Sequence, residues 1–200
     1  MKPTIKDEHL PITIEQQDTS FECFRKVITY TYREDESGLS ATRELVAAHD
    51  AVAVVVFDPR LKKLVLIRQF RLGAQLGTGK GMSVEFPAGL IDPGEHPNDT
   101  ARRELLEETG LHATRLEPLC SFLTTPGVTD EVLHLYYAEA DATKLQSKSG
   151  LASETEQTFP FLTSFEEAMA AVDDNQIQNG IVILGLMWFA RHRAKLESSA

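Results

Sequence analysis

Short runs of β-branched and aromatic residues, separated by polar turns, mark the beginning of the chain. Residues 24–32 (FRKVITYTY) and residues 42–46 each predict a strand, with a turn at residues 34–38 (EDESG) between them. The segment is rich in Phe, Val and Tyr, so it requires apolar surface to cover. The pattern predicts a small β-rich segment at residues 1–46.

The next part of the chain predicts a buried hairpin. Residues 51–57 (AVAVVVF) are a continuous apolar run long enough for a buried strand. Asp58 and Pro59 open a turn, and residues 63–70 (KLVLIRQF) are the expected partner strand. Residues 73–81 (GAQLGTGKG) predict a flexible connector, because Gly follows the Lys where a phosphate-binding P-loop requires Ser or Thr.

Helical signals appear in the second half. Pro97 suits a first helical residue, and Gly110 suits the left-handed position after the last turn, although His96 is a weak N-cap. Ser164 with Glu167 forms a capping box for a second helix. A last helix is expected at about residues 179–195, whose apolar run IVILGLMWFA is too short to span a bilayer and predicts a buried helix.

Further strands complete the predicted fold. They are expected at residues 83–86, 116–123, 132–138 and 158–162, with a turn at Pro126 and a polar loop at residues 150–157. Strands outnumber helices and hairpins dominate, which favours an α/β fold, a mixed α/β sandwich rather than a doubly wound sheet.

Composition narrows the classes of function. The 200 residues, 42% of them hydrophobic, suit one substantial domain with a small appended unit. The formal charge of −10 argues against a nucleic-acid-binding scaffold. Only two cysteines are present and the N-terminus has no apolar signal-peptide core, so we expect a cytoplasmic protein without a membrane segment.

The most informative stretch is residues 89–111, GLIDPGEHPNDTARRELLEETGL. Glu104, Glu107 and Glu108 are related by i, i+3 and i+4, which places three carboxylates on one helical face. Oxygen ligands at that density suit a hard divalent cation, Mg²⁺ or Mn²⁺, that bridges to substrate phosphates. A solvated helix with pairs such as Asp99 and Arg103 is the alternative that the acids alone leave open.

The whole stretch resembles the Nudix box at every defined position. The resemblance implies a Nudix hydrolase with an α/β/α sandwich at residues 47–200, preceded by the small β segment. It also implies that the carbonyl oxygen of Ala88 joins Glu104, Glu107 and Glu108 in holding the metal. The remaining residues of the box would order the loop and helix: Gly89, Glu95, Arg103 and Gly110.

The similarity extends beyond the box. LVLIRQFR, EFPAGLID, TPGVTDE and GLASETE resemble segments of ADP-ribose pyrophosphatases, and Pro126 occupies the place of a proline typical of that subgroup. The resemblance implies Mg²⁺-dependent hydrolysis of ADP-ribose, or another ADP-sugar, to AMP and ribose 5-phosphate. GDP-mannose hydrolases share much of this layout and remain an alternative. A Nudix domain that binds nucleotides without turnover is a more remote alternative, because such proteins typically lose acids of the box.

The same resemblance implies roles for residues outside the box. Arg43 and Arg71 would bind the diphosphate or terminal ribose, where a bidentate guanidinium is useful. Glu154 and Glu156 lie in a polar loop that would supply the general base, with Glu108 also in a catalytic role. Exposed arginines and solvated loop acids are the alternatives. Further residues expected at the substrate are Glu85, Pro126 and Glu131. Glu85 is also a candidate close to the metal, with a buried acid that orders the box loop as the alternative.

Oligomeric state and other chemistries complete the expectations. The resemblance implies a domain-swapped homodimer in which residues 1–46 reach the partner's active site, and exchange of an end segment builds a two-fold dimer readily.

The six histidines are scattered without a zinc-binding pattern, and Ser83 does not fit a nucleophile elbow. The sequence therefore predicts a metal-dependent enzyme acting on a small nucleotide substrate.

Overall fold

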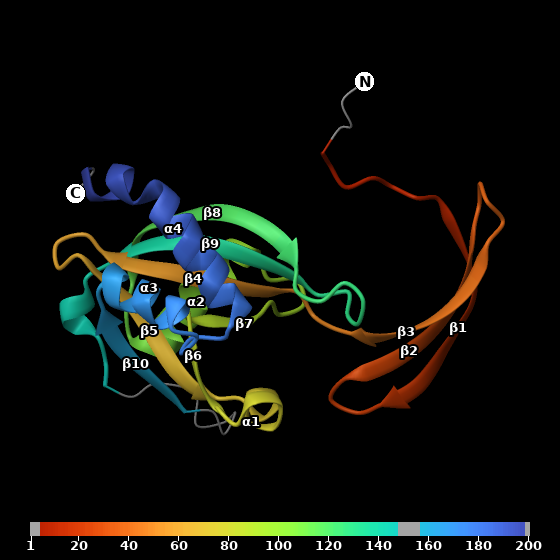
Figure 1. The fold of residues 1–200 in the computed structure, drawn as a ribbon, viewed down its shortest axis with the longest axis horizontal. Coiled ribbons are helices and arrows are strands. Elements are labelled where there is room, and N and C mark those ends of the chain that lie inside the picture. The colour runs from red at the N-terminus through yellow and green to blue at the C-terminus, as the bar shows by residue number, and fades with distance from the viewer. Residues whose placement is uncertain (1–4, 148–156, 199–200) are drawn as a thin grey trace. The chain divides into compact units, whose positions relative to one another are not determined.

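The computed structural model describes residues 5–147 and 157–198, and its contacts divide the chain into two compact units (Figure 1). The first unit comprises Met1–His49 with Leu123–Glu131, and the second comprises Asp50–Phe122 with Val132–Ala200. A separate first unit was expected from the β-rich start of the chain. Its role in dimerisation stays a prediction.

The first unit contains one antiparallel sheet of three strands in the order β1-β2-β3. The strands are β1 (Ile12–Glu22), β2 (Lys26–Glu34) and β3 (Ser40–Ala47). Strand β1 was not predicted, because its sequence ITIEQQDTSFE is largely polar and exposed and only its pairing with β2 shows it to be a strand. The loop at 123–131 joins this unit through the parallel bridge between Val46 and Thr129.

The second unit contains a mixed sheet of seven strands. Its main order is β10-β5-β4-β9-β8, with β6 paired to β5 and β7 paired to β4. Strand β4 runs parallel to β9 and antiparallel to β5 and β7. The strands are β4 (Ala51–Asp58), β5 (Lys63–Phe70), β6 (Met82–Glu85), β7 (Ala88–Leu90), β8 (Ala113–Leu123), β9 (Val132–Ala140) and β10 (Thr158–Thr163).

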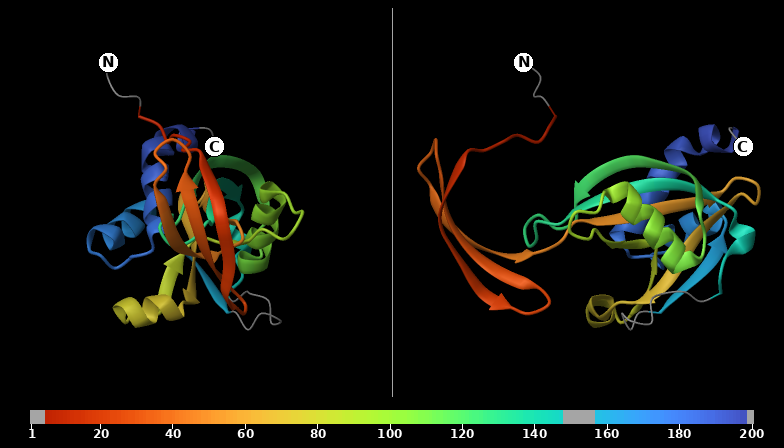
Figure 2. Two further views of the ribbon diagram at one scale, coloured as in Figure 1. Left: turned by 90° about the vertical axis from the view of Figure 1, so that its right-hand side faces the viewer. Right: turned by 180° about the vertical axis from the view of Figure 1, so that it is seen from behind.

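Helices cover both faces of this sheet (Figures 1 and 2). Alternate side chains of β4 enter two separate cores, because successive residues of a strand point to opposite faces. Val54 packs in the core that contains Ala101 and Leu105 of α2 (Pro97–Thr109). Val55 packs in the core that contains Leu186 of α4 (Gly180–Ser198). The arrangement is an α/β/α sandwich, as predicted.

The C-terminal helices differ in part from the expectation. Helix α3 (Phe165–Asp173) begins at Ser164 with the predicted capping box, in which Glu167 accepts from the Ser164 N–H at 2.8 Å. Helix α4 is buried in the core through Val182, Leu186 and Phe189, as predicted, but on one face only, since Leu184 and Met187 are 39% and 41% exposed. Among the described residues, none of the helices has the length and apolar character needed to cross a membrane.

The glycine-rich segment after β5 is not a simple connector. It forms the short helix α1 (Leu72–Thr78), which ends at Gly79 with a φ of 74°. The Gln75 side chain accepts from the Gly81 N–H at 3.0 Å and so closes the turn that follows. A prediction based on glycine content alone could not anticipate this contact between Gln75 and Gly81. A 3-10 turn, η1 (Ala142–Lys144), follows β9.

Candidate active site

The candidate site is a loop and a helix that follow β7. A turn in which the Glu95 N–H donates to the Asp92 carbonyl at 2.9 Å leads into α2. The His96 Nδ1 accepts from the Asn98 N–H at 3.2 Å, so the imidazole caps the helix and the expected weak start was wrong. Gly110, with a φ of 73°, ends the helix as predicted. The loop and helix are therefore ordered at both ends by local contacts.

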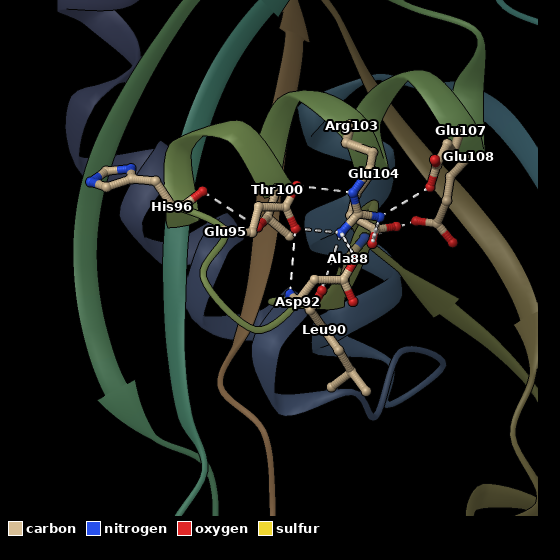
Figure 3. A network of polar contacts seen from close by, with 10 residues as sticks. All are labelled: Ala88, Leu90, Asp92, Glu95, His96, Thr100, Arg103, Glu104, Glu107 and Glu108. Atoms are coloured by element: carbon tan, nitrogen blue, oxygen red, sulfur yellow. Dashed lines mark hydrogen bonds and ion pairs between the residues drawn. The ribbon is translucent and has the colours of Figure 1, made fainter.

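Arg103 connects the loop to the acids of the helix (Figure 3). Its Nε and Nη2 donate to the two carboxylate oxygens of Glu95 at 3.1 and 2.8 Å. Its Nη1 donates to Glu104 Oε1 at 2.6 Å and Glu107 Oε2 at 3.2 Å, and its Nη2 also donates to the Leu90 carbonyl. The Arg103 contacts lower the pKa of Glu95 to about 2, so this carboxylate stays ionised.

Gly89 allows Glu104 to approach the backbone of β7. A Cβ atom at Gly89 would lie 2.0 Å from Glu104 Oε1, far inside van der Waals contact. A side chain of any size at this position would displace the carboxylate. The glycine of the box is therefore required by a close approach, since no positive φ is recorded for it.

Glu108 is the buried acid of the site. Its side chain is almost completely enclosed, and its Oε2 accepts from the Ala88 N–H at 2.8 Å. Burial raises the pKa of Glu108 to about 8, the Ala88 bond opposes that shift, and the charge of Glu104 adds to it. The ionised form of Glu108 therefore needs positive charge beside it.

Arg71 and Glu85 form an ion pair in the same unit. Arg71 follows the last residue of β5 and donates through Nη2 to Glu85 Oε2 at 2.8 Å, while its Nε donates to both oxygens. Both charges act on Glu108: Arg71 lowers its pKa and Glu85 raises it. The structure thus brings together predicted residues of β6, β7 and α2 with Arg71, which directly follows β5.

The carboxylates of Glu104, Glu107 and Glu108 do not point toward one common position. Among residues 5–147 and 157–198, no group of three or more His, Cys, Asp or Glu side chains is arranged to hold a metal ion. Glu104 and Glu107 are turned to Arg103, and Glu108 is turned to the Ala88 N–H. The chemistry of the donors nevertheless fits a hard divalent cation, because they are carboxylate oxygens around one buried acid that lacks a full counter-charge. The predicted metal ligands remain a prediction.

Other predicted residues lie outside this group. Arg43 is exposed on β3, where its Nη1 donates to the Thr42 carbonyl at 2.8 Å. Pro126 is exposed in the turn of the 123–131 loop, and Glu131 accepts from the Thr124 hydroxyl at 2.7 Å. These three residues belong to the first unit and the box residues to the second. Their roles stay predictions.

Glu154 and Glu156, the predicted general bases, fall outside the described residues. Sequence reasoning also missed two contributors to the loop. Thr100 adds a hydrogen bond to Glu95, and the Asp92 N–H donates to Glu95 Oε2 at 3.4 Å. The sequence Asp92-Pro93-Gly94 is typical of a turn, and from it the contribution of Asp92 to the loop could have been predicted. Nothing in the local pattern singled out Thr100.

Comparison with known proteins decides the family. The model of the NUDIX domain matches residues 47–183. The chain belongs to the NUDIX domain family. This confirms the predicted family, and the NUDIX match includes the whole box at residues 89–111.

Relatives of this NUDIX protein extend over nearly the whole chain. It is 31% identical to the ADP-ribose pyrophosphatase of Escherichia coli (strain K12), covering 97% of this chain and 98% of the relative. It is 32% identical to the ADP-ribose pyrophosphatase of Haemophilus influenzae, covering 94% and 90%. It is 33% identical to the GDP-mannose pyrophosphatase of Cronobacter sakazakii, covering 78% and 82%.

A solved structure supports the fold independently. The crystal structure of an ADP compounds hydrolase matches with a TM-score of 0.73 and 23% sequence identity, covering 94% of this chain and 97% of that chain. At this identity the likeness concerns the fold alone. It confirms the sandwich architecture that the strand and helix pattern predicted.

Proposed function

We propose that the protein hydrolyses the pyrophosphate bond of ADP-ribose to AMP and ribose 5-phosphate, using Mg²⁺, with Mn²⁺ as a possible substitute. The observation that carries this proposal is the ordered loop and helix, in which Arg103 holds Glu95, Glu104 and Glu107 beside the buried Glu108. The relatives named ADP-ribose pyrophosphatase, which align over nearly the full chain, support the choice of substrate.

The residues of the site suit this reaction. Glu104, Glu107 and Glu108 with the Ala88 carbonyl would hold the cation, which supplies positive charge to the phosphate oxygens and acidifies water when bound. A water oxygen then forms a bond to phosphorus while the bridging P–O bond breaks. The proton released would pass to a general base, for which the proposed candidates are the loop acids Glu154 and Glu156.

A second candidate substrate has specific support. The relative named GDP-mannose pyrophosphatase aligns over about four fifths of this chain, and the resemblance to GDP-mannose hydrolases includes the IRQFR segment at residues 67–71. A binding module without turnover is less well supported, since all the acids of the box are present.

A substrate panel distinguishes these functions. Purified protein with Mg²⁺ is incubated with ADP-ribose, GDP-mannose, ADP-glucose, NADH and a dinucleoside polyphosphate, and the products are separated by ion-exchange chromatography. We expect AMP and ribose 5-phosphate from ADP-ribose at the highest kcat/KM. A clear preference for GDP-mannose would change the substrate and keep the reaction class. Binding of ADP-ribose without release of AMP, even with Mn²⁺, would support a binding module.

We further propose that the protein is a homodimer whose N-terminal sheet reaches the partner subunit. Residues paired directly across antiparallel strands share a face. Ile14 pairs with Tyr32, and Ile28 pairs with Leu45, which places four large side chains on one face of this sheet, yet Ile14 is 49% exposed. A second copy of the chain would cover this face and bring Arg43, which pairs with Tyr30 on the same face, to its partner's site.

We also propose that the protein acts in the cytoplasm. Both cysteines, Cys23 and Cys120, are exposed free thiols. Unpaired exposed thiols persist most readily in a reducing compartment. Fractionation of the producing cell, followed by immunodetection, would place the protein and reject this proposal if the bulk were extracytoplasmic.

A further inference from the structure

The positions of Arg71 and Glu85 are fixed by the sheet. Glu85 is the last residue of β6 and lies opposite Ile67 of β5, while Phe70 lies opposite Met82. The Arg71 N–H donates to the Gly81 carbonyl at 2.8 Å, which closes the β5–β6 connection. The backbone pairing therefore brings the two side chains together.

The contact between the two side chains is a two-point one. Arg71 Nε lies 3.0 Å from Glu85 Oε1, and Nη2 lies 2.8 Å from Oε2. A paired guanidinium and carboxylate in this geometry fix the orientation of the arginine as well as its position. The side chain of Glu85 is 9% exposed and that of Arg71 is 42% exposed. The acid is therefore buried behind the arginine, and the arginine faces solvent.

Glu85 is also tied to the acidic site by a short rigid segment. Phe86 is buried, and the Pro87 carbonyl accepts from the Val54 N–H at 2.9 Å. The next residue, Ala88, donates its N–H to Glu108. The same few residues thus connect the Arg71–Glu85 pair to Glu108 of α2.

We propose that Glu85 is a positioning residue that holds Arg71 at the edge of the acidic site, oriented to the diphosphate of the substrate. This inference rests on the proposed function. A long arginine side chain beside Glu104, Glu107 and Glu108 is attracted to these acids and would compete with the cation that they hold. The two-point contact with Glu85 prevents that collapse, so the cation and the guanidinium can act on the same substrate.

A double-mutant cycle tests whether Glu85 acts through Arg71. The variants are Arg71→Ala, Glu85→Gln and the double substitution, and the readouts are KM, kcat and the Kd of α,β-methylene ADP-ribose, a non-hydrolysable analogue. We expect each single change to raise KM and Kd by roughly tenfold or more, as for loss of a charge-assisted contact. The double variant should be no weaker than Arg71→Ala. If the effects of the two single changes multiply in the double variant, the two residues act independently and the proposal is overturned.

Metal binding and thermal stability separate positioning from ligation. Arg71→Ala leaves a buried carboxylate without its arginine, so its Tm should fall, and Glu85→Gln in the same chain should restore part of it. Titration with Mn²⁺ alone should give Kd values for Arg71→Ala and the double variant within about threefold of each other. A larger loss on adding Glu85→Gln would show that Glu85 supports the metal site without Arg71 and would reject a role confined to positioning Arg71.

Arg68 provides a matched control on the same strand. It is exposed and lies over the Phe161 ring at 4.3 Å, on the other face of β5. Arg68→Ala should leave KM, the analogue Kd and Mn²⁺ binding unchanged. If the wild-type protein binds and hydrolyses no member of the panel, the proposed function fails and the positioning role fails with it. If the wild type is active and the cycle is additive, the positioning role fails alone.

Discussion

Arg103 and Glu108 illustrate two ways in which this chain keeps a charge on one helix. Arg103 donates to three carboxylates and the Leu90 carbonyl, so its charge is fully compensated. Glu108 is buried and accepts a hydrogen bond from the Ala88 N–H, and burial raises its pKa to about 8. The first arrangement builds a stable loop. The second leaves an acid whose charged form gains from a bound cation.

Substitution of Glu108 tests its catalytic role. Glu108→Gln should lower kcat by at least about a hundredfold, because the amide keeps the size of the side chain but removes the negative charge that the proposed cation site requires. The Tm of the metal-free protein should not fall, because a neutral amide suits a buried site better than a carboxylate does. Kinetics and calorimetry measure both effects, with the exposed Glu117 changed to Gln as the control. Near-normal activity of Glu108→Gln would contradict the assignment of this helix to catalysis.

Gly89→Ala tests the close approach of Glu104 to β7. The new methyl group would meet the Glu104 carboxylate, so this side chain must move away from Arg103. We expect kcat to fall by roughly tenfold or more with the protein still folded, as is usual when a catalytic group is displaced. Gly73→Ala is the control, because a Cβ there meets nothing within 4 Å. Equal activities of the two variants would contradict the steric argument.

At the scale of elements, local signals decided where the helices begin and end. Ser164 and Glu167 start α3, and His96 and Gly110 bound α2. The strands depended more on their neighbours. Strand β7, with three residues, is defined by its pairing with β4, in which Gly89 lies opposite Val52. A segment this short has no periodicity of its own from which it could be predicted.

The capping box of α3 gives a pH-dependent prediction. Hydrogen bonds from Ser164 lower the pKa of Glu167 from its ordinary value of 4.5 to about 2. The ionised Glu167 therefore stabilises the folded state above pH 4.5, and this contribution is lost as the pH falls towards 2. Glu167→Gln, which removes the charge that the Ser164 backbone N–H and hydroxyl stabilise, should lower the free energy of unfolding at pH 7. Urea titrations should show the difference shrinking at acid pH, and a pH-independent difference would contradict the charged cap.

At the scale of the whole molecule, acidic residues outnumber basic ones, and this excess is partly offset around the site. The chain carries 30 Asp and Glu against 20 Lys and Arg. Around the site, Arg71 and Arg103 offset part of the negative charge of four glutamates. An anionic substrate can approach such a protein only where cations and arginines are concentrated. This makes metal dependence the expected property of the whole enzyme.

The proposed homodimer can be tested by complementation. Arg43→Ala subunits are mixed with Glu108→Gln subunits under conditions that allow exchange, each variant being nearly inactive alone. If Arg43 serves the partner's site, heterodimers carry one intact site and activity should return to about a quarter of the wild-type level, from random pairing into dimers with one site restored. A monomer in sedimentation, or no recovery after proven exchange, would reject the swapped arrangement.

The sequence by itself determined the family, the class of fold and the identity of the acidic helix. Those conclusions rest on order along the chain: apolar residues at every position of 51–57, capping residues at helix ends, and acids at helical spacing in residues 104–108. The tertiary structure decided the burial of Glu108, its contact with an N–H 20 residues away, and the pairing of Arg71 with Glu85 across 14 residues. The strand β1 and the helix α1 were also settled by contacts. Periodicity records which face a residue occupies, whereas burial and pairing depend on residues distant in the chain that meet only when it folds.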